Sequence, residues 1–294
     1  MSLARRALLG AALAALVATQ ALAWPAETMT GLTRDARRLL PRSLSQLLAA
    51  REAQVQLQMA RLPPAVAQGI ARDLRAGRLT PETVAAVDDE VAGAVQLLRE
   101  RRVSEGLVRL GGLARVTADL SDPVLAVGPE GWPRGLPREY YALFAANVSR
   151  MPVVLDYSLL CPPGTAALPP AAGCSAPVPP GLDAFELKRA RLPGIWQSLV
   201  ERSREQVPTI REELVREGRV VSHDQLDFRS PAWAAASLAY SRAVTATAVT
   251  WLAAWREAHG DLTRMATPRV VAPVDAPAAA AAAQDRRLSP PEAP

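Results

Sequence analysis

Histidine and cysteine are scarce in this chain, and their scarcity limits the metal chemistry that it can support. The 294 residues include only two histidines, His223 and His259, and two cysteines. A zinc centre needs several imidazoles, thiolates or carboxylates that converge on one ion. Two histidines cannot supply a histidine-rich zinc cluster. The sequence also lacks a P-loop, a CxxC pair and a glycine-rich dinucleotide fingerprint.

Lysine is almost absent, and arginine carries the positive charge. Lys188 is the only lysine, and the formal net charge is +5. The arginines are scattered among acidic residues along the predicted helices, a pattern that favours a solvated surface of mixed charge. We find no nucleic-acid signature in this distribution.

The first 23 residues have the pattern of a secretory signal peptide. Arg5 and Arg6 precede an apolar run over 7–18, and Ala21-Leu22-Ala23 matches a cleavage site. The apolar run is too short to span about 30 Å of hydrocarbon, which disfavours the alternative of a membrane anchor. We therefore expect cleavage of residues 1–23, no transmembrane segment afterwards, and a periplasmic or secreted protein that begins at Trp24.

Two further segments carry expectations about chain organisation. Cys161 and Cys174 flank a loop rich in proline, alanine and glycine, and in an exported protein this spacing predicts a disulfide. A reactive or metal-binding thiol pair is the alternative. From Thr267 the chain is rich in alanine and proline and predicts a disordered tail over 267–294. Residues 24–266 are then expected to form a single helical domain.

Apolar residues recur at helical spacing through most of the chain and predict an all-α fold. We find no strand alternation. The clearest helix begins at Ser230-Pro231 and runs to about His259, with a stripe expected to pack in the core. The stripe contains Trp233, Ser237, Tyr240, Val244, Ala248, Trp251 and Trp255. Other predicted helices span 32–40, 43–61, 65–76, 81–102, 104–122, 138–149, 183–191 and 195–217, the last with a kink at Pro208.

The segment 110–125 supplies a family resemblance. It reads Leu-Gly-Gly-Leu-Ala-Arg-Val-Thr-Ala-Asp-Leu-Ser-Asp-Pro-Val-Leu. This resembles the central helix of the zinc-dependent phospholipase C family, Leu-Gly-x-x-Ala-His-x-x-x-Asp-Leu-x-x-Pro-x-His, whose fold the fungal single-strand nucleases share. The expected Trp24 start matches the family's N-terminal tryptophan, a metal ligand there, and 227–255 resembles the family's last helix. The resemblance implies a phospholipase C-like helical bundle and, in the family, zinc.

The departures from the family pattern fall on its metal ligands. Arg115 and Leu125 stand where the central motif has histidines, while Asp119 is kept. In the alignment, Pro137 and Tyr141 occupy the positions of a His-x-x-x-Glu pair, and Thr30 occupies that of an early histidine. The resemblance therefore implies a degenerate site with no catalytic residues and no bound metal or cofactor.

Two interpretations of Arg115 and Asp119 remain open from sequence. The arginine replaces the missing metal beside a buried carboxylate, or the two residues form an ordinary exposed helix pair. We expect Trp24, Arg115, Asp119 and Tyr141 to line a vacated groove with a possible phosphate-bearing or anionic ligand. The predicted function is an exported, non-catalytic binding or structural protein.

Two alternatives accompany that prediction. One is a metal-dependent phosphodiesterase with a reduced, carboxylate-rich site. The other is an unrelated helical envelope protein, in which Trp24 would be disordered and far from Asp119.

Overall fold

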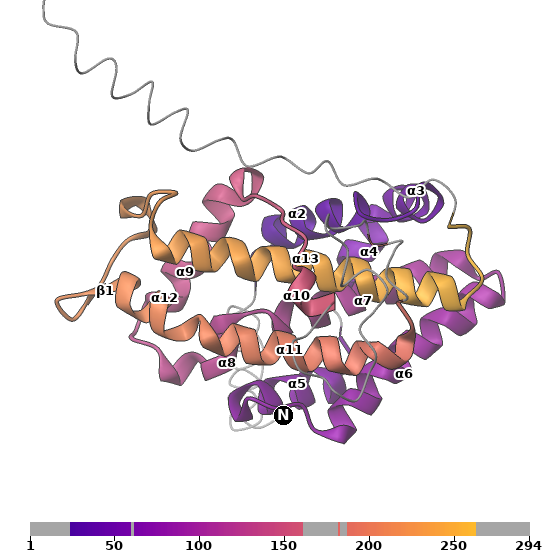
Figure 1. Ribbon diagram of the computed structural model, residues 1–294, viewed down its shortest axis with the longest axis horizontal. Coiled ribbons are helices and arrows are strands. Elements are labelled where there is room, and N and C mark those ends of the chain that lie inside the picture. Colours follow the sequence, from indigo (N-terminus) through magenta and orange to yellow (C-terminus); the bar gives the residue numbers. More distant parts are fainter. Residues whose placement is uncertain (1–23, 60–61, 161–181, 183–186, 263–294) are drawn as a thin grey trace, which may run out of the picture.

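The computed structural model describes residues 24–59, 62–160, 182 and 187–262 (Figure 1). This part of the chain is helical apart from one short hairpin, which confirms the all-α class. The predicted signal peptide, the cysteines Cys161 and Cys174, and the predicted tail over 267–294 lie outside the described residues. Within the described residues, no helix combines the length and the apolar character needed to cross a bilayer.

Helices make up most of the described chain. The α-helices are α2 (Ala26–Arg37), α3 (Arg42–Ala50), α4 (Glu52–Met59), α5 (Pro64–Ala76), α6 (Pro81–Arg99), α7 (Val103–Leu120), α8 (Pro123–Val127), α9 (Leu136–Asn147), α10 (Tyr157–Leu160), α11 (Leu192–Glu205), α12 (Val207–Leu214) and α13 (Pro231–Glu257). Single 3₁₀ turns form η1 (Pro129–Gly131), η2 (Val148–Arg150), η5 (Arg189–Arg191) and η6 (His223–Gln225). The strands β1 (Val215–Arg216) and β2 (Arg219–Val220) pair antiparallel.

The sequence prediction of a kinked helix over 195–217 is wrong. The helix breaks at Gln206, and α12 ends at Leu214 before the hairpin. Pro208 lies in the first turn of α12, where its missing N–H costs nothing. Gly218 adopts φ +75° and turns the chain between the two strands. The apolar pattern of the sequence did not predict this hairpin. Similarly, the helix predicted over 43–61 is two helices, α3 and α4, that meet at Arg51.

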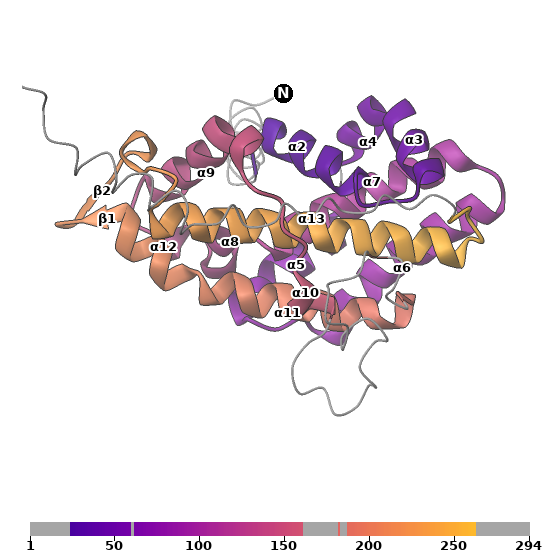
Figure 2. The same cartoon turned by 45° about the horizontal axis from the view of Figure 1, so that its top comes forward.

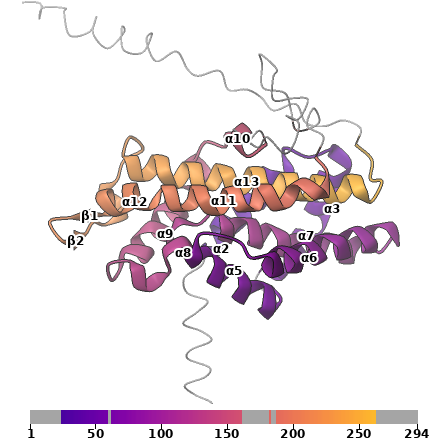
Figure 3. The same cartoon turned by 60° about the horizontal axis from the view of Figure 1, so that its bottom comes forward.

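Helix α13 runs the length of the molecule and organises the layers. It lies between α2 and α3 on one side and α11 and α12 on the other (Figures 1 and 2). The layer of α11 and α13 covers α5, α6 and α7 (Figure 3). All members of its predicted stripe are buried, which confirms the stripe as a core face. Ser230 caps the helix, since its hydroxyl accepts a hydrogen bond from the Trp233 N–H at 3.2 Å.

Helix α7 occupies the centre of the bundle and packs on α4, α6 and α13. Gly111 permits the close approach of α4, because a Cβ there would lie 2.5 Å from the Val55 carbonyl oxygen. Two polar contacts join α7 to α13. The Trp251 indole donates to the Leu110 carbonyl at 2.7 Å, and the hydroxyls of Thr117 and Thr247 lie 2.6 Å apart. The helix that carries the family-like motif is therefore held from several sides.

Candidate functional site

Arg115 and Asp119 form a largely buried ion pair on α7. Nε of Arg115 donates to Oδ1 of Asp119 at 2.6 Å, one helical turn further along. The two side chains are 23% and 11% exposed, respectively. The interpretation as an ordinary solvent-exposed pair is therefore wrong. Removing either charge would leave the other in a poorly solvated place.

The electrostatics of this pair are dominated by burial. Burial raises the pKa of the Asp119 carboxyl, because a carboxylate loses its hydration there, and Arg115 partly opposes this rise. The negative charge of Asp119 raises the pKa of Arg115. The guanidinium therefore stays protonated and supplies the positive charge that makes the buried carboxylate tolerable.

Asp122 extends the pair into a network. Its Oδ1 accepts from the Val124 N–H at 2.8 Å, which makes it the N-cap of α8, and its Oδ2 accepts from the Tyr141 hydroxyl at 2.8 Å. The residue is fully buried, and burial raises the pKa of its carboxyl to about 7. The negative charge of Asp119 contributes to this rise in pKa. We call Arg115, Asp119, Asp122 and Tyr141 the α7 network.

Trp24 belongs to a row of aromatic rings. Its ring centroid is 4.8 Å from that of Phe144 and 6.3 Å from that of Tyr240. Phe144 contacts Tyr140 at 5.1 Å, and Tyr140 contacts Tyr141 of the α7 network at 5.8 Å. Trp24 is only 4% exposed, which contradicts the disordered Trp24 expected for an unrelated envelope protein.

The four predicted groove residues therefore fall into two groups. Arg115, Asp119 and Tyr141 belong to the α7 network, whereas Trp24 reaches Tyr141 only through the rings of Phe144 and Tyr140. Trp24 and Tyr141 are buried in a packed aromatic cluster. The rings of Phe144 and Tyr140 lie between Trp24 and Tyr141, and a groove shared by all four residues stays a prediction.

The residues present do not fit the zinc centre that the family resemblance implies. Within the described ranges, no group of three or more His, Cys, Asp and Glu side chains could hold a metal ion. Both Asp122 oxygens and one Asp119 oxygen already accept hydrogen bonds from the protein. Pro137 is buried in the first turn of α9, and a prolyl side chain offers no ligand atom. The Thr30 hydroxyl donates to the Ala26 carbonyl at 2.9 Å.

Among the described residues, neither histidine contacts the α7 network. Nδ1 of His223 lies 2.9 Å from Oε2 of Glu139, and the His223 N–H donates to the same oxygen at 3.0 Å. Hydrogen bonding to His223 lowers the pKa of Glu139. These contacts tie η6 to α9. His259 follows α13 with φ +59° and helps to end that helix.

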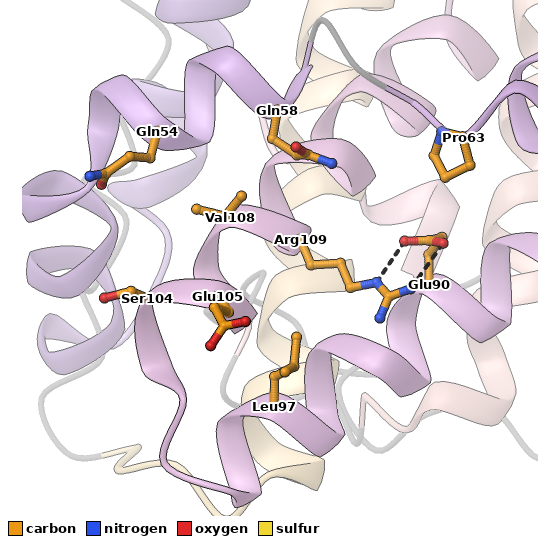
Figure 4. Close-up of a pocket in the computed structure, with 9 residues that line it drawn as sticks. All are labelled: Gln54, Gln58, Pro63, Glu90, Leu97, Ser104, Glu105, Val108 and Arg109. Atoms are coloured by element: carbon orange, nitrogen blue, oxygen red, sulfur yellow. Dashed lines mark hydrogen bonds and ion pairs between the residues drawn. The ribbon is translucent and has the colours of Figure 1, made fainter.

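A hollow of about 510 Å³, which we call the α7 hollow, lies between α4, α6 and the first half of α7 (Figure 4). Arg109 crosses it and binds Glu90 through two bonds, Nε to Oε2 at 2.7 Å and Nη2 to Oε1 at 3.2 Å. Glu105 binds both Nε and Nη2 of Arg102. Every charged side chain that lines this hollow is therefore already neutralised by a partner.

A second hollow of about 590 Å³, the α13 hollow, lies at the N-terminal end of α13. Its apolar lining comes from Pro152, Leu226, Phe228 and Trp233, and its polar lining from Asn147, Arg150 and Asp227. The lining combines apolar and polar groups, and a hollow of this size is large enough for a small molecule.

Sequence reasoning missed the roles of Asp122 and Arg109. The Asp122-Pro123 pair does carry a recognisable N-cap signal, but only the fold brings Tyr141 to it. Arg109 and Arg150 look like any other arginine of this arginine-rich chain. Their surroundings arise from helix packing, which the sequence does not display.

Comparison with known proteins returned no match, whether against family models, curated proteins or solved structures. Function must therefore be argued from the residues and their geometry.

Proposed function

We propose that this chain is an exported, non-catalytic binding protein on a phospholipase C/nuclease-like helical scaffold whose metal centre has been replaced. The observation that carries the proposal is the α7 network. In the place of the family-like motif, Arg115 binds Asp119 at 2.6 Å, and Asp122 accepts hydrogen bonds from the Tyr141 hydroxyl and the Val124 N–H, both at 2.8 Å. A guanidinium there stabilises the retained carboxylate in place of a metal ion.

The charge balance of the network argues for a structural role of Arg115 itself. The Arg115 guanidinium donates to Asp119 at 2.6 Å, and it also interacts electrostatically with Asp122. The network is therefore neutral or negative near neutral pH, depending on the protonation of Asp122. A phosphate dianion would meet a compensated guanidinium, so we expect inorganic phosphate not to bind there. Ligand binding would then use another surface of the molecule.

The alternative, a metal site with a reduced set of ligands, would require a different arrangement of the same residues. An ion would need carboxylate oxygens that face a common point with no donor between them. Arg115 occupies one side of Asp119, and Tyr141 and the Val124 N–H occupy Asp122. We therefore favour the non-catalytic role over a phosphodiesterase or phospholipase activity.

Metal content tests this proposal directly. The full protein, purified without chelators, is analysed by mass spectrometry for zinc and manganese, and assayed for phosphodiester hydrolysis with either metal added. We expect less than one-tenth of an equivalent of metal, no hydrolysis, and an unfolding temperature that is unchanged by a chelator. Near-stoichiometric metal, or metal-dependent hydrolysis, would overturn the proposal.

Arg115→His sharpens the test, because it restores the family's residue at that position. We expect this variant to be destabilised without gaining zinc, since Tyr141 and Leu125 still replace other ligands. If Arg115→His keeps full stability, Arg115 does not support the buried carboxylate, and the replacement role assigned to it is wrong.

A further inference from the structure

The α13 hollow contains two opposite charges without partners, in contrast to the α7 hollow. Within the described part of the chain, no side chain or carbonyl binds the Arg150 guanidinium. Asp227 uses Oδ1 to accept the Arg229 N–H at 2.8 Å, and its Oδ2 accepts from no described donor. The two charges line the same hollow without forming an ion pair with each other.

The rest of the lining is suited to an apolar group. Trp233 is 9% exposed and lies on the first turn of α13, held by the Ser230 cap. Phe228 is 69% exposed, a large share for a phenylalanine, and the Arg229 guanidinium lies 5.4 Å from its ring centroid. Pro152 and Leu226 complete the apolar part. Exposed aromatic surface beside a hollow is characteristic of a ligand site.

We propose that the α13 hollow binds a zwitterionic α-amino acid with a large apolar side chain, its carboxylate on Arg150, its ammonium on Asp227 and its side chain against Trp233 and Phe228. A planar guanidinium offers two parallel N–H donors that match a carboxylate. The free Asp227 oxygen is an acceptor for an ammonium group. Because the two protein charges do not pair with each other, both are available to one ligand of opposite polarity.

The charges that line the hollow select the class of ligand. The Asn147 amide donates one N–H to the Leu143 carbonyl at 3.0 Å, which leaves its second N–H and its oxygen for a ligand. A purely anionic ligand would be repelled by Asp227, and a purely cationic ligand by Arg150. A zwitterion satisfies both charges together.

This inference rests on the proposed non-catalytic binding function, and the test separates the two. Isothermal titration calorimetry of the full protein uses L-phenylalanine, and compares it with N-acetyl-L-phenylalanine, L-phenylalaninamide and L-serine. We expect each analogue to bind at least about tenfold more weakly than L-phenylalanine, since each loses one of the three contacts. Absence of L-phenylalanine binding at millimolar concentration to folded protein would overturn the inference. It would leave the metal-free, non-catalytic role standing.

Two variants assign the charges individually. Arg150→Gln is expected to weaken L-phenylalanine at least about tenfold but to leave the weaker binding of the amide unchanged. Asp227→Asn keeps an oxygen for the Arg229 N–H, so the turn before α13 is preserved. It is expected to weaken L-phenylalanine but not the N-acetyl analogue. Arg138→Gln, an exposed arginine on α9 outside the hollow, is the matched control. Equal binding of the acetylated and free amino acids, or indifference to both variants, contradicts a zwitterion site.

Discussion

The charged side chains of the α7 network are paired and largely buried, whereas those of the α13 hollow are exposed and form no ion pair with each other. In the network, Arg115 binds Asp119 at 2.6 Å, and both oxygens of Asp122 accept hydrogen bonds in the interior of the bundle. In the hollow, Arg150 and Asp227 face the same space without pairing within the described chain. Buried charges require partners for the fold to be stable, whereas charges at an open hollow are hydrated and free to bind a ligand. The comparison separates the residues that support the scaffold from those available for recognition.

Removing one charge from each region gives the largest contrast. Arg115→Met leaves Asp119 buried without its cation, and we expect a loss of about 3–5 kcal/mol of unfolding free energy. Arg150→Gln removes an exposed, unpaired charge and is expected to change stability by less than about 0.5 kcal/mol. Urea denaturation of both variants measures the difference.

The double variant Arg115→Met with Asp119→Leu is the control for this prediction. It removes both charges, so we expect most of the lost stability to return. If the double variant is as unstable as Arg115→Met alone, the loss comes from packing and the ion pair is not its cause.

The pH dependence of stability tests the buried Asp122. Its pKa is about 7 in the folded protein, above the ordinary value of 3.8, so the folded state holds a proton that the unfolded state releases between these values. The stabilising contribution of Asp122 is therefore complete below about pH 4 and is lost as the pH rises through 7.

Asp122→Asn keeps an oxygen for the Val124 N–H and removes the titration. We expect the variant to be more stable than the unmodified protein at pH 8, by about 4 kcal/mol, with little difference at pH 4. Denaturation curves at the two pH values measure this change. If the stability of Asp122→Asn depends on pH as that of the unmodified protein does, another group causes the pH dependence.

Tyr141→Phe tests the hydrogen bond that the Tyr141 hydroxyl donates to the Asp122 carboxyl. The variant loses the 2.8 Å hydrogen bond to Asp122 but keeps the ring against Tyr140. We expect a loss of about 1–3 kcal/mol at pH 8, because the acceptor is then ionised, and a smaller loss at pH 5. Equal losses at both values would show that the bond does not depend on the charge of Asp122.

The smallest effect on stability is expected at the edge of the α13 hollow. Phe228→Ser removes a ring that is 69% exposed, so thermal unfolding should shift by no more than about 1 °C. The same variant should weaken L-phenylalanine several-fold in calorimetry. A large fall in unfolding temperature would place Phe228 with the scaffold residues and remove it from the recognition surface.

Local sequence signals predicted the elements better than their ends. Ser230-Pro231 and Thr80-Pro81 mark the starts of α13 and α6, since a capping hydroxyl and a first-turn proline act within a few residues. The hairpin β1–β2 and the break between α3 and α4 were missed. A two-residue strand contains too few residues to show alternation, and the break at Arg51 follows from packing against neighbouring helices.

The candidate site was predictable only in part. The spacing of Arg115 and Asp119 indicated an i,i+4 pair, but their burial depends on the packing of α7 against helices such as α4 and α13, which come from other parts of the chain. Asp122 was expected only to end a helix. Its elevated pKa and its bond to Tyr141 arise from the position of α9.

By itself, the sequence determined the helical class, the apolar face of α13 and the shortage of zinc ligands, because periodicity, capping and composition are local or additive properties. Only the tertiary structure decided which charges are neutralised and which remain available. Arg115, Arg109 and Arg150 are chemically identical side chains. Their different roles follow from burial and from the carboxylates that distant helices bring within hydrogen-bonding distance.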